Sequence, residues 1–156
     1  MGQNFQAQRH ELVYGLRRLS IELDAVGSRF AALHGLNRTD VRAMIAIMDA
    51  DRAGQPMTPG TLGAAVQLSS ASVTALLDRL ERAGHVRRVR DSEDRRRVGL
   101  ELTESALAAG EAFFGGLQRE LVATLSTYSP AELEVIRRFL AQSTAAVVDH
   151  QAPDQG

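Results

Sequence analysis

The sequence predicts a mainly α-helical fold with a small β wing, in which a winged helix-turn-helix unit lies between long N- and C-terminal helices. Three observations predict this fold class. Apolar residues recur at helical spacing through most of the 156 residues. Short helix patterns lie in the middle of the chain, between longer ones. A hairpin pattern dense in arginine follows the last of the short helices.

The composition limits both the core and the chemistry. Hydrophobic residues make up 44% of the chain, but aromatic residues only 4%, and tryptophan is absent. A core built from leucine, valine, isoleucine, methionine and alanine suits helices. The chain has no cysteine, which excludes disulfides, thiolate catalysis and cysteine-based redox sensing. Because no apolar run approaches the length of a membrane span and no signal-peptide pattern opens the chain, we expect a cytoplasmic protein without a membrane partner.

The first helix is expected to run from about residue 6 to residue 33. Its apolar residues alternate at steps of four and three, which is the a/d seam of a heptad, and Gly35 supplies a stop. A strip of this length is typical of a helix that pairs with other long helices. The seam consists of Leu12, Leu16, Leu19, Leu23, Val26, Phe30 and Leu33.

A second helix is expected over about 39–50, with Asn37 and Asp40 able to form a capping box at its start. A loop over 49–57 follows it. The residues expected to face the core are Val41, Met44, Ile45 and Met48.

A helix-turn-helix pattern comes next. Thr58 and Pro59 open a short helix over 58–66, and Gln67-Leu68 form the turn. Ser69 or Ser70 then caps a second short helix, which Gly84 ends in a left-handed conformation. The buried face of this helix is expected to carry Val73, Leu76, Leu77 and Leu80.

The rest of the chain predicts a wing and two helices. Two β segments near 85–90 and 97–102 flank a polar turn at 91–94. Thr103 caps one long helix, and the capping box from Ser129 to Glu132 opens another. Their apolar positions are Leu107, Phe113 or Phe114, Leu117, Leu121 and Leu125 in the first, and Leu133, Ile136, Leu140 and Val147 in the second. We therefore divide the chain into a dimerisation region, 6–35 with 104–150, and a winged helix-turn-helix domain, 36–103.

Charge is distributed unevenly along the chain. Residues 79–97 hold eight arginines against four acidic residues, a net charge of +4, while the remainder holds ten against fifteen, a net charge of −5. All eighteen basic residues are arginine. A local excess of positive charge on a chain of net charge −1 favours an orientation in which residues 79–97 face a phosphate backbone and the acidic remainder points away from it.

The second short helix of a helix-turn-helix enters the major groove with its N-terminal residues at the base edges. Hydroxyl groups there bind bases or phosphates, and an arginine further along reaches the backbone. We assign these contacts to Ser70, Ser72, Thr74 and Arg79. On the helix pattern alone, an ordinary helical hairpin with a polar outer face is an equal alternative.

The hairpin changes that balance. Arginine fits a narrow minor groove, where the negative potential is strongest. Asp94 lies two residues before Arg96 and is placed to orient its guanidinium. The alternative, a surface cluster of salt bridges, is disfavoured by the helix pattern directly upstream. The wing residues assigned to DNA binding are Arg88, Arg90, Asp94, Arg95, Arg96 and Arg97.

The wing also carries the pattern D-x-R-x-x-x-x-x-L-T without a gap, as Asp94, Arg96, Leu102 and Thr103. On this signature and the stretch 68–97, the chain resembles the MarR (multiple antibiotic resistance regulator) family of winged helix-turn-helix transcription factors over roughly residues 8–148. The resemblance implies a homodimer with interlocking terminal helices, a pseudo-palindromic operator in double-stranded DNA, and Arg96 in the minor groove braced by Asp94. For many members it implies release of DNA when a small aromatic or phenolic compound binds between the dimer helices and the winged domain.

The redox branch of that family depends on a cysteine, which this chain lacks. No motif marks a ligand pocket, so pocket candidates come from position alone. For each of them, packing in the core is the favoured interpretation. The candidates are Tyr14, Phe30, His34, Met44, Met48 and Phe113.

No pattern in the chain predicts an enzyme, a cofactor or a metal site. The four histidines are scattered, without an H-E-x-x-H spacing, and neither a phosphate-binding glycine loop nor a nucleophile elbow is present. We predict a dimeric, sequence-specific DNA-binding regulator, a repressor relieved by a small effector. Two alternatives remain at this point: a winged-helix module that binds an acidic protein, and a DNA-binding protein that senses no ligand.

Overall fold

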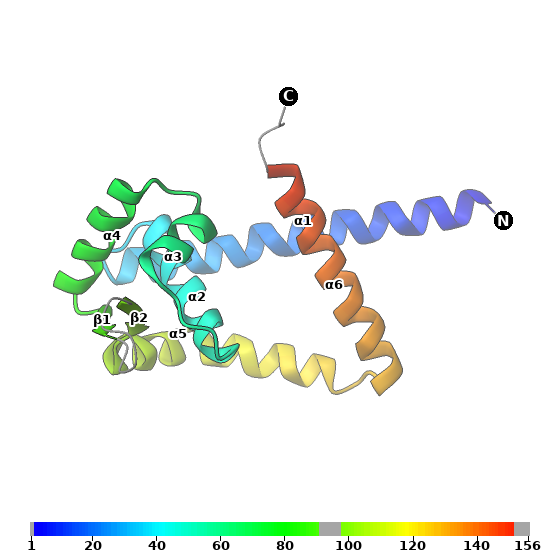
Figure 1. Cartoon of the computed structure of the whole chain (residues 1–156). Helices are drawn as coiled ribbons and strands as arrows, with labels where there is room; N and C mark the ends of the chain where they lie inside the picture. The colour runs from blue at the N-terminus through cyan, green and yellow to red at the C-terminus, as the bar shows by residue number, and fades with distance from the viewer. Residues whose placement is uncertain (1, 91–97, 152–156) are drawn as a thin grey trace, which may run out of the picture. The chain divides into compact units, whose positions relative to one another are not determined.

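The computed structural model describes residues 2–90 and 98–151. It confirms the predicted fold class: six helices and a two-stranded wing, coloured along the chain in Figure 1. The chain forms two compact units, Met1–Gly110 and Glu111–Gly156, which are described separately. Its elements are α1 (Gly2–Leu33), α2 (Arg38–Arg52), α3 (Pro59–Val66), α4 (Ser70–Arg82), β1 (Val86–Arg90), β2 (Val98–Leu102), α5 (Glu104–Leu125) and α6 (Pro130–Gln151).

Local sequence signals set the helix starts. At α2 the Asn37 side chain accepts from the amide of Asp40 at 2.9 Å, and the Asp40 carboxylate accepts from the amide of Asn37 at 3.0 Å, which confirms the capping box. Thr58 forms the same reciprocal arrangement with Thr61 at α3. Ser69 caps α4 by accepting from the amide of Ser72 at 3.3 Å.

The predicted loop after α2 begins later than expected. The helix continues to Arg52, so both Asp49 and Asp51 are helical, and the chain turns only at Gly54, whose φ is +65°. The polar sequence at the end of α2 contains no helix breaker before this glycine, which explains the extra turn. Gly84 adopts the predicted left-handed conformation, with a φ of 74°. The predicted turn at Gln67 is present, and its φ of 58° shows that it too is left-handed.

The core of the first unit lies between α2, α3, α4 and the wing. All four apolar residues predicted for α4 are buried. On α2 the prediction was wrong for Ile45, which is 44% exposed, while Ile47 is buried at 1%. The helix offers two apolar stripes, one through Ile45 and Met48 and one through Ala43 and Ile47. The second stripe belongs to the core cluster with α3 and α4, and Met48 is half-buried beside it.

Helices α3 and α4 approach closely at Gly63. A Cβ atom placed there would lie 3.1 Å from Cγ2 of Val73 and 3.2 Å from the carbonyl oxygen of Leu68. Both distances are shorter than ordinary van der Waals contacts of a Cβ atom, so an added methyl group would force the α3–α4 backbone or the Val73 side chain to shift.

We therefore expect Gly63→Ala to lower the free energy of unfolding by about 1–3 kcal/mol, which urea titration measures. Gly60→Ala on the same helix is the matched control, since its added Cβ would meet only Oγ1 of Thr58 at 3.9 Å. If both variants unfold at the parent's urea concentration, the close approach of α3 and α4 is not a constraint.

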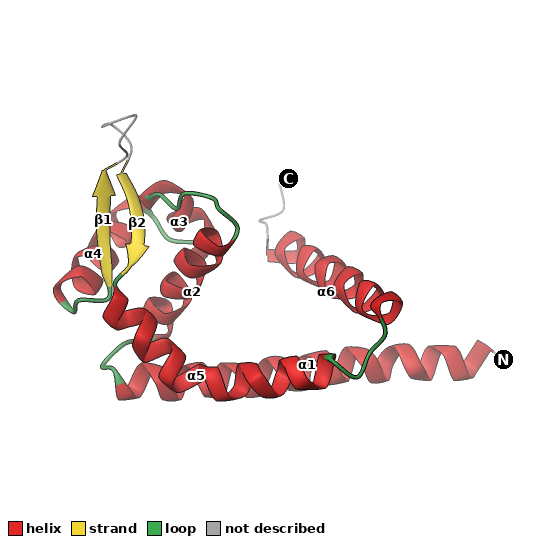
Figure 2. Ribbon diagram, turned by 90° about the horizontal axis from the view of Figure 1, so that it is seen from below, coloured by secondary structure: helices red, strands yellow, loops and turns green. Residues whose placement is uncertain are grey.

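The wing is an antiparallel hairpin, drawn as yellow arrows in Figure 2. Its register pairs Val86 with Leu102 and Arg88 with Leu100. The Leu100 N–H donates to the Met57 carbonyl at 2.8 Å and so ties β2 to the segment before α3, while the Thr103 N–H donates to the His85 carbonyl at 3.0 Å and closes the base of the hairpin. The base of the wing is thereby held against the helix-turn-helix.

The second unit contains most of α5 and all of α6. The predicted capping box at α6 is present: the Ser129 amide donates to Glu132 at 2.8 Å, and Ser129 Oγ accepts from the Glu132 amide at 3.4 Å. Hydrogen bonds from the hydroxyl and amide of Ser129 lower the pKa of Glu132. Large apolar side chains remain exposed along both helices, among them Leu121, Leu125, Leu140 and Val147.

Within the described residues, no single helix has the length and apolar composition to cross a membrane. Helices α3 and α4 meet that test only as a pair, across a bend of 105°.

Candidate nucleic-acid interface

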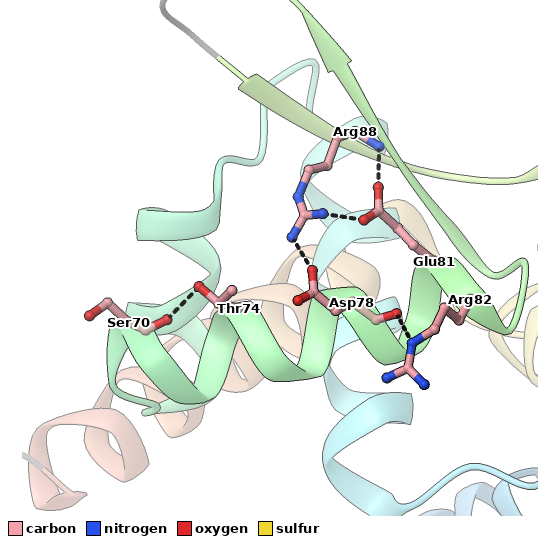
Figure 3. A network of polar contacts seen from close by, with 6 residues as sticks. All are labelled: Ser70, Thr74, Asp78, Glu81, Arg82 and Arg88. Atoms are coloured by element: carbon pink, nitrogen blue, oxygen red, sulfur yellow. Dashed lines mark hydrogen bonds and ion pairs between the residues drawn. The ribbon is translucent and has the colours of Figure 1, made fainter.

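The outer face of α4 carries a row of exposed polar side chains. Ser70, Thr74 and Asp78 follow one another at steps of four, so they lie along one side of the helix (Figure 3). The Thr74 hydroxyl donates to the Ser70 carbonyl at 3.0 Å, and the Ser72 hydroxyl lies 2.9 Å from that of Ser69. A hydroxyl that donates its hydrogen internally still offers lone pairs to a base or an amino group. The predicted contact residues Ser70, Ser72 and Thr74 are thus all on the surface.

Arg88 connects the wing to this helix. Its Nη2 donates to Oδ1 of Asp78 at 2.9 Å, its Nη1 contacts the Glu81 carboxylate, and its backbone amide donates to Glu81 at 3.2 Å (Figure 3). Side chains alternate between the faces of a strand, so Arg88 shares the face of buried Val86, toward α4. The sequence-based assignment of Arg88 to DNA did not include these acidic partners, which the structure places around its guanidinium.

The neighbouring Arg87 is also paired within the chain. It lies opposite Glu101 in the hairpin register and donates two hydrogen bonds to its Oε2, at 3.0 and 2.6 Å. The positive charge of the wing base is therefore locally compensated. Both the carboxylate and the guanidinium are substantially exposed, so the pair contributes little to stability.

Arg79 differs most from its prediction. Instead of extending outward, its guanidinium contacts the Asp40 carboxylate of α2, with Nη2 to Oδ1 at 2.5 Å and Nε to Oδ2 at 3.3 Å. Asp40 is only 1% exposed, and this hydrogen bond is the main cause of a raised pKa at Arg79. The sequence did contain a signal for this contact, because Asp40 precedes Met44 by four residues and Ile47 by seven, on the buried face of α2.

The distal part of the wing lies outside the described residues. The backbone of Arg90 ends β1, opposite Val98, but the positions 91–97 are not described. The assignments of Asp94, Arg95, Arg96 and Arg97 to DNA therefore stay predictions.

The six pocket candidates lie in different surroundings. Met44 belongs to the core cluster, and Phe30 is buried with its ring 4.4 Å from that of His34. Tyr14 is 59% exposed, with the Arg17 guanidinium 5.5 Å from its ring centroid. Met48 is half-buried. Phe113, in the second unit, packs edge-on against Phe114 at 4.8 Å. The structure thus brings Phe30 and His34 together and places Met44 in the core.

A second histidine lies near this pair. The ring of His85, at the start of the wing, is 6.4 Å from that of His34. Burial lowers the pKa of His85, repulsion from His34 lowers it further, and the Asp40 charge partly opposes both effects. The folded protein therefore holds His85 in its neutral form more strongly than the unfolded chain does.

Because the unfolded chain takes up this proton more readily, acidification below the ordinary histidine pKa of about 6.5 is expected to lower the free energy of unfolding. The loss begins near that pH and levels off below the folded-state pKa. His85→Gln should reduce the difference in urea midpoint between pH 7.5 and pH 5.5, whereas His10→Gln, on an exposed part of α1, should not. Equal pH dependence in the parent and His85→Gln would contradict this account.

The arrangement is that of known transcriptional regulators. The MarR family model matches residues 34–97. An HTH-type transcriptional regulator of Bacillus subtilis, YcgE, itself uncharacterized, is 37% identical over 109 residues, which is 70% of this chain and 68% of YcgE. The B. subtilis HTH-type transcriptional repressor YetL is 28% identical over 88% of this chain and 81% of its own.

Solved structures of S. aureus MepR share the fold at 21% sequence identity. A variant from a multidrug-resistant clinical isolate superposes with a TM-score of 0.69, covering 87% of this chain and 96% of MepR. MepR structures with DNA and with ethidium bromide give TM-scores of 0.55 and 0.56, each covering 86% of this chain and 98% and 95% of MepR respectively. With these matches and the geometry above, this chain belongs to the MarR family of winged helix-turn-helix transcriptional regulators, which are DNA-binding proteins and not enzymes.

Proposed function

We propose that this chain is a dimeric repressor that binds a pseudo-palindromic operator. Helix α4 would lie in the major groove with Ser70, Ser72 and Thr74 at base edges, and the wing would reach the adjacent minor groove. The observation that carries the proposal is the exposed hydroxyl row of α4 directly beside an arginine-rich hairpin. YetL, a repressor, and MepR, solved with DNA, support it by likeness.

Within this proposal, phosphate contacts belong mainly to the distal wing. Arg87 and Arg88 are compensated by acidic side chains of their own domain. Their charges stiffen the base of the wing and attract DNA less than isolated arginines would. Arg90, Arg95, Arg96 and Arg97 are therefore the residues proposed to contact the backbone and minor groove, with Asp94 orienting Arg96.

Dimerisation is supported by the exposed apolar strip of the terminal helices. Leu12, Leu19 and Leu23 of the predicted heptad seam are 63%, 47% and 44% exposed. A water-exposed strip of this regularity on a long helix is typical of a surface that a second copy covers. We propose that residues 6–35 and 104–150 form this interface and that 36–103 bind DNA.

The proposed effector is a small aromatic compound, as suggested by the MepR complex with ethidium. It would act by binding one arrangement of the dimer better than another and so shift the population away from the DNA-bound form. The candidate contacts from position are Tyr14, Phe30, His34, Met48 and Phe113; Met44, which is 6% exposed in the core, is more simply explained by packing.

Selection from a random-sequence DNA library tests the DNA-binding proposal, because it does not require the operator to be chosen in advance. We expect enrichment of an inverted repeat with half-sites about one helical turn apart. Enrichment of no sequence would leave a protein-binding module as the explanation. Thermal denaturation with small phenolic acids or ethidium then tests ligand sensing, since a ligand of the folded state must raise Tm; no rise with any compound would indicate a regulator without an effector.

A further inference from the structure

An ion pair between the buried carboxylate of Asp40 and the half-exposed guanidinium of Arg79 joins α4 to α2. Asp40 lies in the first turn of α2, just after the segment that leads in from α1, and Arg79 lies 39 positions further along, in α4. The Asp40 side chain is 2% exposed and that of Arg79 45%. The pair therefore spans from the interior of the domain to its surface.

The carboxylate of Asp40 accepts three hydrogen bonds from two partners. Oδ2 accepts from the amide of Asn37 at 3.0 Å and from Nε of Arg79 at 3.3 Å, and Oδ1 accepts from Nη2 of Arg79 at 2.5 Å. One side chain thus caps α2 and receives a two-point guanidinium contact. Two parallel contacts fix the orientation of a guanidinium as well as its distance. A single contact from an ammonium group does not fix that orientation.

The pair is poorly suited to a purely stabilising role. Burying the carboxylate of Asp40 is costly, and solvent screens part of its attraction to Arg79, whose side chain is 45% exposed. A two-point contact of this kind constrains the orientation of α4 relative to α2. Arg79 is nine residues from Ser70, or roughly 13 Å along the helix axis. A rotation of α4 by about 10° about that anchor would move its N-terminal end by about 2 Å, which is enough to break a hydrogen bond to a base.

We propose that Arg79 and Asp40 position α4 for operator recognition, and that Arg79 is not itself a DNA contact. The proposal rests on the proposed DNA binding. In this proposal, a shift of the segment between α1 and α2, residues 34–37, moves Asp40, and the ion pair to Arg79 then moves the hydroxyl row of α4. Arg79 then belongs with the residues that orient the interface, while Ser70, Ser72 and Thr74 make it.

Charge and geometry give opposite expectations for Asp40→Asn. This variant removes a negative charge from a DNA-binding domain, so electrostatic attraction alone predicts equal or tighter binding. It keeps an oxygen for the Asn37 amide but sets an amide group against the donors of Arg79. If the pair positions α4, Asp40→Asn should instead weaken binding to a library-selected duplex about tenfold.

Arg79→Lys and Arg79→Gln complete the experiment. A positioning role predicts that Arg79→Lys and Arg79→Gln lose about the same affinity and that both keep the parent's salt dependence. It also predicts that the double variant Asp40→Asn/Arg79→Gln binds no more weakly than the weaker of the two single variants. Asp49→Asn is the matched control, since this exposed carboxylate lies on the same helix as Asp40; its affinity should equal or exceed the parent's. All affinities are measured well below each variant's Tm, with helicity checked by circular dichroism, so that loss of folding is separated from loss of binding.

The outcomes distinguish the explanations. A direct phosphate contact would appear as parent-like binding by Arg79→Lys and Asp40→Asn. It would also reduce the log–log salt slope of Arg79→Gln by about 1.8, which is about 0.9 for each of the dimer's two protomers. This result would overturn the proposal. If Asp40→Asn does not fold, Arg79→Lys alone tests the proposal, because the Arg79 side chain is half exposed and its replacement leaves the core intact. Parent-like affinity of Arg79→Lys would again overturn the proposal. Failure of the parent to bind any selected duplex would refute the proposed function itself, which is a different result.

Discussion

Replacing Ile47 with alanine is expected to lower the free energy of unfolding by about 2–5 kcal/mol, the largest stability effect we expect from a single substitution in α2. Ile47 is 1% exposed and lies in the cluster shared by α2, α3, α4 and the wing. Truncation of Ile47 removes its apolar contacts and leaves a cavity, which the surrounding helices fill only partly because they relax little. Urea titration at fixed protein concentration measures the change, because dimerisation would make stability concentration-dependent.

Ile45 offers a control of the same residue type on the same helix. It is 44% exposed, so Ile45→Ala should change the free energy of unfolding by less than about 1 kcal/mol. The two variants also test which residues of α2 face the core, because the sequence predicted Ile45 there and missed Ile47. A larger loss for Ile45→Ala than for Ile47→Ala would mean that α2 faces the core with its other stripe.

The second large effect concerns DNA. Arg96→Ala is expected to weaken operator binding by about 1–3 kcal/mol, or about 5- to 150-fold, because a minor-groove guanidinium is lost. Thermal unfolding should stay nearly unchanged. Fluorescence anisotropy with the selected duplex measures the affinity.

Arg137→Ala is the matched control for Arg96→Ala. Arg137 is an exposed arginine of α6, paired with Glu134 three residues before it, so its loss removes the same charge from a helix that we do not place on DNA. Equal affinities for the parent and Arg96→Ala would remove the wing from the interface.

The sequence predicted those parts of the fold that depend on neighbouring residues. The capping boxes at Asn37 and Ser129, the N-cap and proline at Thr58-Pro59, and the left-handed Gly84 are all local patterns, and all are present. Each requires only hydrogen bonds within one helical turn. Local chemistry therefore predicts where these helices begin and end without any long-range information.

Contacts between distant residues were not predicted. The sequence assigned Arg79 and Arg88 to DNA because both carry charge near a recognition helix. The carboxylate partner of Arg79 comes from α2 and those of Arg88 come from α4, and only the packing of these elements brings them within reach. Because side chains alternate along a strand, the sequence places Arg88 on the same face of β1 as Val86. It does not show that the carboxylates of Asp78 and Glu81 lie next to that face.

The choice between the two apolar stripes of α2 failed for a similar reason. Ile45 and Ile47 have the same hydrophobicity and lie two positions apart, so periodicity alone does not distinguish them. The decision is made by the neighbouring helices, which pack on the stripe that contains the small Ala43. Close packing of this kind is a property of the assembled core.

The salt dependence of operator affinity shows whether the arginine-rich wing and the adjacent helix α4 bind a phosphate backbone. If the dimer neutralises about 6–10 phosphates, affinity for the selected duplex should fall by about 10³–10⁵ between about 50 and 200 mM salt. An affinity that changes less than about threefold over that range would contradict the account, because binding would then not depend on the guanidinium groups on which it is built.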